Sequence, residues 1–256
     1  MLKSLLAHPL TRGLDLDDPR TTALRRRIIQ EKTFLRQIYQ EWYSILASDL
    51  PAGAGAAIEL GSGAGFLRDF VPNLITSEVF GCVGVDIVLS GLDLPIKPAS
   101  LRAIVMVDVL HHLPQARGFF REAARCVRPG GVVAMIEPWV TPWSRLVYTR
   151  MHHEPFDPEA PAWEFPASGP LSGANGALPH ILFARDRAQF EREFPMWRIR
   201  TIEPMMPFCY LVSGGVSMRG LMPGWSFSWW RGLEKLLHPL TGELAMFAHI
   251  VLQKRV

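Results

Sequence analysis

The chain has 256 residues, of which 48% are hydrophobic and 20% are charged. A mainly disordered chain is excluded, because disorder requires few hydrophobic residues and a high net charge. No apolar run reaches the roughly 18 residues of a membrane span, which excludes a transmembrane protein. The net charge is only +3, and the basic run at residues 25–27 falls in a helical pattern. We therefore expect a solvated helix face there and no nucleic-acid binding.

The three cysteines, Cys82, Cys126 and Cys209, are far apart in the sequence and form no Cys-x-x-Cys pair. A disulfide framework or a zinc site is therefore not expected, and a reducing compartment fits. The apolar stretch within residues 1–6 is too short for a signal peptide. Together these features predict a cytoplasmic protein.

The first segment, residues 1–54, is predicted to be helical. Apolar residues recur at helical spacing over residues 20–50, with Thr21 or Thr22 as the N-cap and Pro51 as the stop. Residues 51–57 are all small, which is typical of a loop.

A short buried strand is predicted at residues 56–60, followed by glycines at positions 61, 63 and 65 and a helix at residues 66–71. A strand, a glycine turn and a helix in this order form a nucleotide-binding unit. The glycines let the backbone turn tightly and let a ligand approach, and the helix would offer the partly positive end of its amides.

Strands and helices alternate through the rest of the chain. Strands are predicted at residues 74–79, 83–89, 101–107, 132–136, 197–202 and 247–254, and helices at residues 115–127 and 185–194. This alternation indicates an α/β fold with a Rossmann-like, seven-stranded, mostly parallel sheet and helices on both faces. Residues 55–256 would form this domain, with irregular insertions at about residues 138–182 and 204–245 that act as a lid.

The glycine turn does not fit a dinucleotide. Phe66 stands where the dinucleotide pattern requires its third glycine. Glu59 lies two residues before the turn, and its carboxylate would repel a pyrophosphate but attract an ammonium or sulfonium group. The ligand that fits is S-adenosylmethionine.

Four further motifs accompany this turn in order. The turn lies in the stretch at residues 58–65, and the four further motifs lie at residues 94–96, 100–107, 108–113 and 128–131. In order and spacing this set resembles the class I S-adenosylmethionine-dependent methyltransferases, in particular the small-molecule branch that includes quinone-biosynthesis enzymes. The resemblance implies methyl transfer with S-adenosylmethionine as cofactor.

The resemblance also implies roles for individual residues. The glycine turn, with Gly61, Ser62, Gly63 and Gly65, would pack against the methionine and ribose of the cofactor, and Glu59 would orient the turn or the cofactor's amino group.

An acid at the end of the second strand would hold the ribose hydroxyls. Glu78 is favoured for this role, and Asp86 is the alternative. Ser90 stands in place of the family's usual acid near the adenine, with Leu92 beside it. Val107 and Asp108 end a sheet strand, where ligands of such sheets bind.

The candidate bases are histidines. His111 lies in a Leu-His-His-Leu turn, and His153 lies beside His152 in the first insertion, where a histidine can titrate near neutral pH. The alternative for each of these positions is a structural role, in a turn or in an ordinary polar loop. Because adjacent histidines rarely point the same way on a strand, we expect no metal site.

Substrate contacts are expected from the segment after the fifth strand. Glu137 and Trp139 follow that strand at the ligand edge of the sheet, with His152 further on, and seven of the eight tryptophans lie after Glu137. This distribution favours a small, apolar or aromatic acceptor. Separately, we expect methylation at oxygen. A catalytically silent binding module is one alternative.

A methyltransferase that acts on a lipid at the membrane surface is the other alternative. Residues 225–237 can form a short amphipathic helix with tryptophan at one end, as in interfacial anchors. Peripheral membrane contact is therefore open, as is the oligomeric state.

Overall fold

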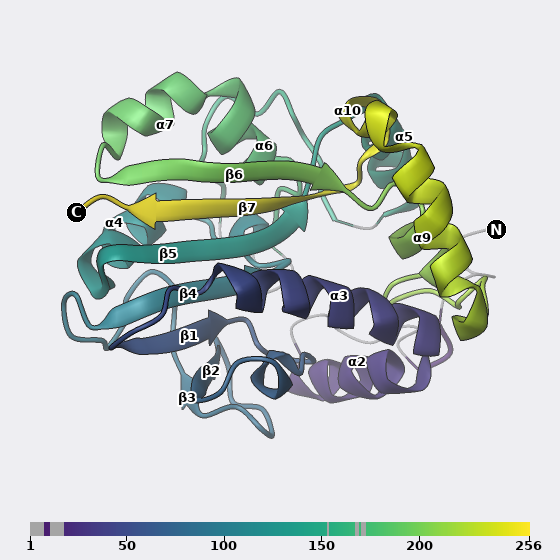
Figure 1. Ribbon diagram of the computed structural model, residues 1–256, viewed down its shortest axis with the longest axis horizontal. Helices are drawn as coiled ribbons and strands as arrows, with labels where there is room; N and C mark the ends of the chain where they lie inside the picture. Colours follow the sequence, from purple (N-terminus) through teal and green to yellow (C-terminus); the bar gives the residue numbers. More distant parts are fainter. Residues whose placement is uncertain (1–7, 11–17, 153, 167–168, 170–172) are drawn as a thin grey trace.

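The computed structural model describes residues 8–10, 18–152, 154–166, 169 and 173–256. Its seven strands are β1 (Ala56–Leu60), β2 (Leu74–Glu78), β3 (Ile87–Val88), β4 (Leu101–Val107), β5 (Val127–Pro138), β6 (Trp197–Met205) and β7 (Phe247–Lys254). They form one sheet in the order β3-β2-β1-β4-β5-β7-β6 (Figure 1). Only β7 runs antiparallel to its neighbours. The predicted α/β fold with a seven-stranded, mostly parallel sheet is confirmed.

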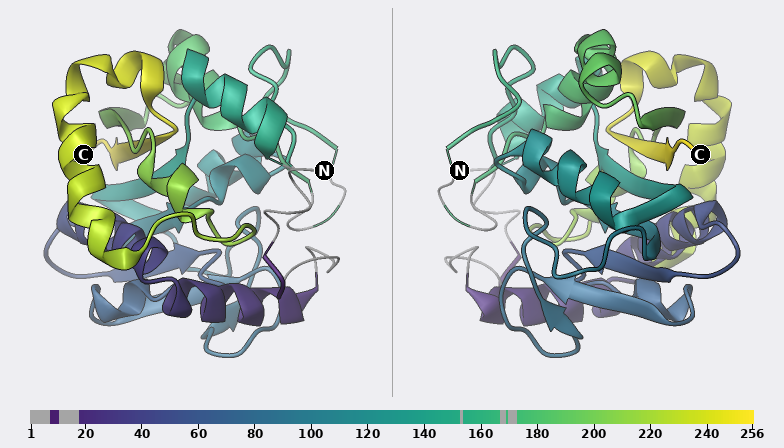
Figure 2. Two further views of the ribbon diagram at one scale, coloured as in Figure 1. Left: turned by 90° about the vertical axis from the view of Figure 1, so that its right-hand side faces the viewer. Right: turned by 90° about the vertical axis from the view of Figure 1, so that its left-hand side faces the viewer.

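Helices cover both faces of the sheet, as Figure 2 shows from its two ends. The α-helices are α2 (Pro19–Glu31), α3 (Thr33–Asp49), α4 (Ala116–Cys126), α5 (Pro142–Met151), α6 (Leu178–His180), α7 (Arg187–Glu193), α8 (Cys209–Ser213), α9 (Phe227–Leu236) and α10 (Thr241–Leu244). A five-residue π-helix, η3 (Ile181–Arg185), joins α6 to α7.

The central strands divide their side chains between two hydrophobic cores. Ile104 and Val133 point into the core that α4, α6 and α7 cover. Their neighbours Val105 and Ala134 point into the core under α2 and α3. Because successive side chains of a strand face opposite sides, a strand that is buried on both faces is a nearly continuous apolar run in the sequence.

Where one helix is predicted over residues 20–50, the structure has two, α2 and α3, with a different start. Lys32 interrupts it with φ −85° and ψ 88°, and its ammonium group donates to the carbonyl oxygens of Gly215 (2.5 Å) and Met218 (3.0 Å). Asp18, not a threonine, is the N-cap, since its side chain accepts from the backbone N–H of Arg20.

Two elements near the glycine turn are shorter than predicted. In place of a helix at residues 66–71 there is one 3-10 turn, η1 (Leu67–Asp69), because Pro72 follows and restricts the residue before it. The strand expected at residues 83–89 is reduced to β3, and Val83 is 91% exposed. The turn is therefore not followed by a helix N-terminus that could bind an anion.

The two insertions are more ordered than their composition indicated. The first holds α5 and α6, and the second holds α8, α9 and α10. Thr141 caps α5 in a reciprocal pair of hydrogen bonds with Ser144, and Pro142 occupies the first turn. The amphipathic helix predicted within residues 225–237 is present as α9. Within the described part of the chain, no helix combines the length and apolar character that a bilayer span requires.

Candidate active site

A cavity of about 410 Å³ lies at the carboxyl ends of β1, β2 and β4. The chain order of the sheet reverses between β1 and β4, and open α/β sheets bind their ligands at such a point. Twelve residues proposed from the sequence line this cavity: Glu59, Gly61, Ser62, Gly63, Gly65, Glu78, Ser90, Leu92, Val107, Asp108, His111 and His152. The structure thus brings most of the predicted site together.

The glycine turn is held against β2 by serine hydrogen bonds. The N–H of Ser62 donates to the carbonyl of Ser77 (2.8 Å), and the Ser77 hydroxyl donates to the carbonyl of Glu59 (2.7 Å). Gly61 has φ +66°, a conformation that side chains disfavour. A Cβ at Gly63 would lie 2.9 Å from the Glu78 carboxylate. The backbone of the turn therefore stays open to a ligand only with glycine.

Two buried carboxyl groups flank this turn. Burial raises the pKa of Glu59 to about 7, with a further rise from Glu78 and an opposing hydrogen bond from Ser62. Burial also raises the pKa of Glu78, whose Oε1 accepts from the N–H of Val79 (2.9 Å). Both groups are less than 10% exposed, so a cationic or hydroxyl-bearing ligand would find acceptors with little competing water.

Asp86, the alternative ribose ligand, lies elsewhere. Its carboxylate forms an ion pair with Arg68 and accepts from the N–H of Thr76 (2.9 Å), and it is not part of the cavity lining. These partners occupy Asp86 on the outer side of β2. The geometry therefore favours Glu78 over Asp86 as the proposed ligand of the ribose.

Residues of the two N-terminal helices also line the cavity, which the sequence analysis did not foresee. They are Thr22, Arg25 and Ile29 of α2 and Tyr39 and Tyr43 of α3. The spacing of the two tyrosines, four residues apart on one helix face, was an available signal. The sequence alone does not indicate that this helical segment packs against the site.

The basic run at residues 25–27 is only partly a solvated helix face. Arg25 lines the cavity, and Arg26 donates to the carbonyl oxygens of Gly63 (3.1 Å) and Val83 (3.2 Å). Only Arg27 pairs with a residue of its own helix face, Glu31. Two of the three arginines thus serve the ligand cavity or its walls.

Asp108 follows β4 in a left-handed conformation with φ +55°. Positive φ is uncommon in non-glycine residues, and such strained residues cluster at functional sites. The carboxyl lines the cavity, and burial raises its pKa to about 7, with His111 opposing the rise and Glu137 and Glu154 adding to it. A group with this pKa can exchange a proton at neutral pH.

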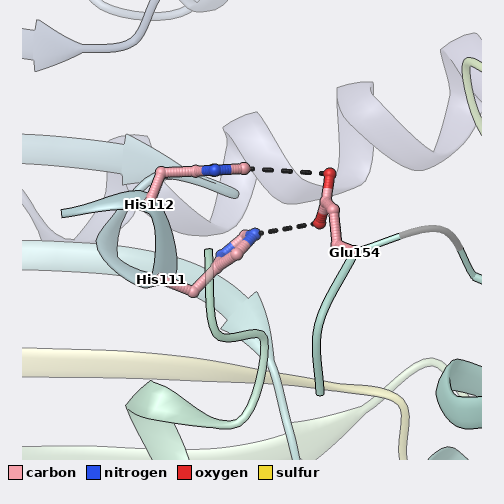
Figure 3. A group of neighbouring side chains, drawn as sticks. All are labelled: His111, His112 and Glu154. Atoms are coloured by element: carbon pink, nitrogen blue, oxygen red, sulfur yellow. Dashed lines mark ion pairs between the residues drawn. The ribbon is translucent and has the colours of Figure 1, made fainter. Parts of the chain in front are cut away.

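A cluster of histidines and carboxylates closes the other end of the cavity. His111 and His112 lie on the 3-10 turn η2 (Leu110–His112), and Glu154 follows α5. His111 Nε2 is 3.5 Å and His112 Nε2 is 3.9 Å from the two oxygens of Glu154 (Figure 3). The premise of our expectation of no metal is therefore wrong here, because the pair lies on a tight turn and both rings face one carboxylate.

The charges of this cluster are strongly coupled. Burial lowers the pKa of His111, but the carboxylates of Glu137 and Glu154 outweigh it and raise that pKa to about 10. Burial and the charge of His111 lower the pKa of His112 to about 4. The pKa of Glu154, which burial alone would raise, is lowered by the nearby histidines.

The remaining predicted site residues take other positions. Glu137 is completely buried and accepts from the N–H groups of Val109 (2.9 Å) and Leu110 (2.7 Å), so it braces η2 rather than lining the cavity. Trp139 is also outside the lining and packs against His180 in the core that α4, α6 and α7 cover. His153 lies outside the described residues.

Tryptophan does not line the cavity within the described residues. Trp163, for example, is buried, donates to Asp186 (2.9 Å) and stacks under Arg117. The uneven distribution of tryptophan therefore reflects packing and surface positions. The aromatic wall of the cavity consists of tyrosines and a phenylalanine: Tyr39, Tyr43, Tyr148, Tyr210 and Phe247.

Comparison with known proteins agrees with this architecture. Residues 76–135 match the family model described as a methyltransferase domain. A chain from the complex of the Haloferax volcanii Trm112 methyltransferase activator aligns with a TM-score of 0.51 and 10% identity, over 91% of this chain and 98% of that one. Geranyl diphosphate C-methyltransferase from Streptomyces coelicolor aligns with a TM-score of 0.48 and 14% identity, over 98% and 90% of the two chains. Residues 76–135 thus match a methyltransferase domain, and the shared fold agrees with the sequence-based prediction of a class I S-adenosylmethionine-dependent methyltransferase.

Proposed function

We propose that this methyltransferase transfers the methyl group of S-adenosylmethionine to oxygen of a small apolar or aromatic acceptor. The observation that carries the proposal is one continuous cavity. Its first end has the glycine turn with Glu59 and Glu78, and its second end has aromatic side chains with Asp108 and the histidine cluster. A cofactor and an acceptor can therefore meet at the end of β4.

The first end suits the polar groups of the cofactor. Glu78 lies beside the glycine turn, with one carboxylate oxygen 2.9 Å from the position that a Cβ at Gly63 would take. We assign Glu78 to the ribose hydroxyls. Glu59 lies behind the turn and is assigned to the turn or the cofactor's amino group. Ser90 and Leu92 line the same cavity and are assigned to the adenine side.

The second end suits an acceptor with an apolar body and a polar reacting atom. Tyr148, Tyr210 and Phe247 supply the apolar wall. Methyl transfer is an in-line displacement on a carbon that the cofactor has already activated, so the protein mainly positions the two reactants. A hydroxyl acceptor must also lose its proton.

Asp108 is our assignment for the group that takes this proton. It lines the cavity, and its raised pKa of about 7 suits a base at neutral pH better than that of His111, which is held as a cation between Glu137 and Glu154. The variant Asp108→Asn is expected to lower kcat by about 10²-fold or more while the cofactor Kd changes little. An unchanged kcat would exclude Asp108 as the base.

Calorimetric titration with S-adenosylmethionine tests the proposed function directly. We expect saturable binding, loss of that binding in Gly63→Arg, and normal binding in Gly242→Arg, an exposed position with open space around it. Formation of S-adenosylhomocysteine with a panel of phenols and apolar alcohols tests turnover. A protein that binds the cofactor but forms none of this product, even with cell extract, would instead be a silent binding module.

A lipid acceptor at a membrane surface is the second candidate function. Trp225 is 86% exposed, Trp229 66% and Leu236 76%, all on or beside α9. Exposed tryptophan next to basic residues is typical of interfacial anchors. Wild-type protein should then sediment with anionic phospholipid vesicles and the double variant Trp225→Ala/Trp229→Ala should not. Equal sedimentation of the two proteins, or none, would exclude this anchor.

A further inference from the structure

The histidine cluster has the geometry of a ligand site rather than of an ordinary hydrogen-bonded group. The ring centroids of His111 and His112 lie 4.2 Å apart, and both rings direct Nε2 toward the carboxylate of Glu154 (Figure 3). One donor atom from each of the three side chains lies within 4.8 Å of the other two. Three ligand atoms from two separate segments therefore surround one point.

The opposite nitrogen of each ring is fixed by an acceptor. His111 Nδ1 lies 2.7 Å from Glu137, which is itself held by two backbone N–H groups. His112 Nδ1 lies 3.1 Å from the carbonyl oxygen of Gly173. Metal-binding histidines are held in this way, because a carboxylate or carbonyl that accepts from one ring nitrogen sets the tautomer and orients the other toward the ion.

The hydrogen bond of His112 has a consequence for its second nitrogen. A carbonyl oxygen can only accept, so Nδ1 of His112 carries the hydrogen, and in the neutral ring Nε2 then carries a lone pair. That lone pair faces an oxygen of Glu154 at 3.9 Å. A cation placed between this nitrogen and the carboxylate can bind both.

The donor set indicates which cation. Two imidazole nitrogens and one carboxylate oxygen suit divalent ions such as Zn²⁺, Co²⁺, Fe²⁺ and Mn²⁺, whereas Mg²⁺ and Ca²⁺ prefer oxygen ligands alone. We propose that His111, His112 and Glu154 bind a divalent first-row transition metal at the acceptor end of the cavity. Any proton on Nε2 of these rings leaves to solvent when the ion binds, and the Nδ1 protons stay with Glu137 and Gly173.

Small movements bring the ligands to bonding distance. Zinc binds histidine nitrogen at about 2.0–2.1 Å and carboxylate oxygen at about 2.0–2.2 Å, so its ligand atoms lie roughly 3.3 Å apart. The separations of the two Nε2 atoms from the Glu154 oxygens, 3.5 and 3.9 Å, are close to that value, and all three donor atoms lie within 4.8 Å of one another. Three protein ligands leave at least one coordination position open. As all three side chains line the cavity, this position is accessible to an acceptor oxygen, a role that rests on the proposed function.

Titration of the metal-free, untagged full chain with Co²⁺, followed by visible d–d absorption, tests the site. We expect one saturable Co²⁺ per chain that Zn²⁺ displaces. His112→Ala and Glu154→Gln should each weaken Co²⁺ binding by about tenfold or more. His238→Ala is the matched control, since His238 is exposed and far from the cluster in sequence, and it should bind as wild type. Circular dichroism checks that each variant is folded.

Two results would overturn the metal site. One is the absence of saturable Co²⁺ absorption with wild-type protein, and the other is wild-type affinity in a folded Glu154→Gln or His112→Ala variant. S-adenosylmethionine binding is measured by calorimetry on the same preparations without metal. Loss of cofactor binding with intact Co²⁺ binding would refute the proposed function alone, so the two failures are distinguishable.

Discussion

The turn after β1 allows a quantitative test at Gly61. Substitution by alanine puts a residue with a side chain at φ +66°, which costs about 1–2 kcal/mol for an L-amino acid. The new Cβ would also lie 2.5 Å from Cγ2 of Val109, and overpacking of this kind costs about 1–3 kcal/mol. We therefore expect Gly61→Ala to lower the free energy of unfolding by about 2–5 kcal/mol.

Two further variants separate these contributions. Gly130 has φ +74° with no neighbouring atom near a Cβ, so Gly130→Ala should show the backbone cost of about 1–2 kcal/mol alone. Val109→Ala removes the overlapping methyl group, so the double variant Gly61→Ala/Val109→Ala should be about 1–3 kcal/mol more stable than the sum of the single effects predicts.

Urea unfolding followed by far-ultraviolet circular dichroism measures all four variants. Additive effects at Gly61 and Val109, within about 0.5 kcal/mol, would refute the overlap as the reason for glycine at this position. A Gly130→Ala variant as damaging as Gly61→Ala would assign the whole cost to the backbone.

Three other predictions concern carboxyl groups. Glu78→Gln should weaken S-adenosylmethionine binding by about tenfold or more in calorimetry, whereas Asp86→Asn should leave it unchanged, and the reverse order would exchange their roles. Because the folded pKa of Glu59 is raised from 4.5 to about 7, wild-type protein should lose about 3 kcal/mol of stability relative to Glu59→Gln as pH rises from 4.5 to 7, and parallel urea-unfolding profiles would contradict this. Glu234 is buried, accepts from two N–H groups at the start of α8 (2.7 and 2.8 Å) and pairs with Arg231. Glu234→Ala should therefore lower the free energy of unfolding, measured in urea, by about 3–5 kcal/mol. Glu243 is exposed, so Glu243→Ala should change this free energy little and serves as the control.

Asp108 and His111, the two candidate bases of the cavity, have different surroundings. Asp108 lies at the open end of β4, whereas His111 lies between two carboxylates that hold it as a cation. If a metal occupies the cluster, its charge replaces that of the Nε2 proton of His111, and Glu137 keeps its contact with Nδ1. The proposed base and the proposed metal site therefore need not compete for the same group.

The sequence by itself determined the sheet and the glycine turn. The strands β1, β4 and β7 are apolar runs between turn residues, and burial on both faces leaves few other conformations for such runs. Gly61 and Asp108 follow two of these strands directly, so their place at the ligand edge follows from strand direction alone. These features could be predicted because the residue pattern within each short segment indicates them, although the strands pair with segments distant in sequence.

Only the tertiary structure decided which distant segments complete the cavity. Tyr39 and Tyr43 reach it because α3 packs across the sheet, and Glu154 reaches the histidine pair because the chain returns after α5. Trp139 lies outside the cavity lining because its side chain packs against His180 in the core that α4, α6 and α7 cover. Contacts of this kind depend on how whole helices and strands pack together. A local sequence pattern shows which face of an element is apolar, but it does not show which other element will pack against that face.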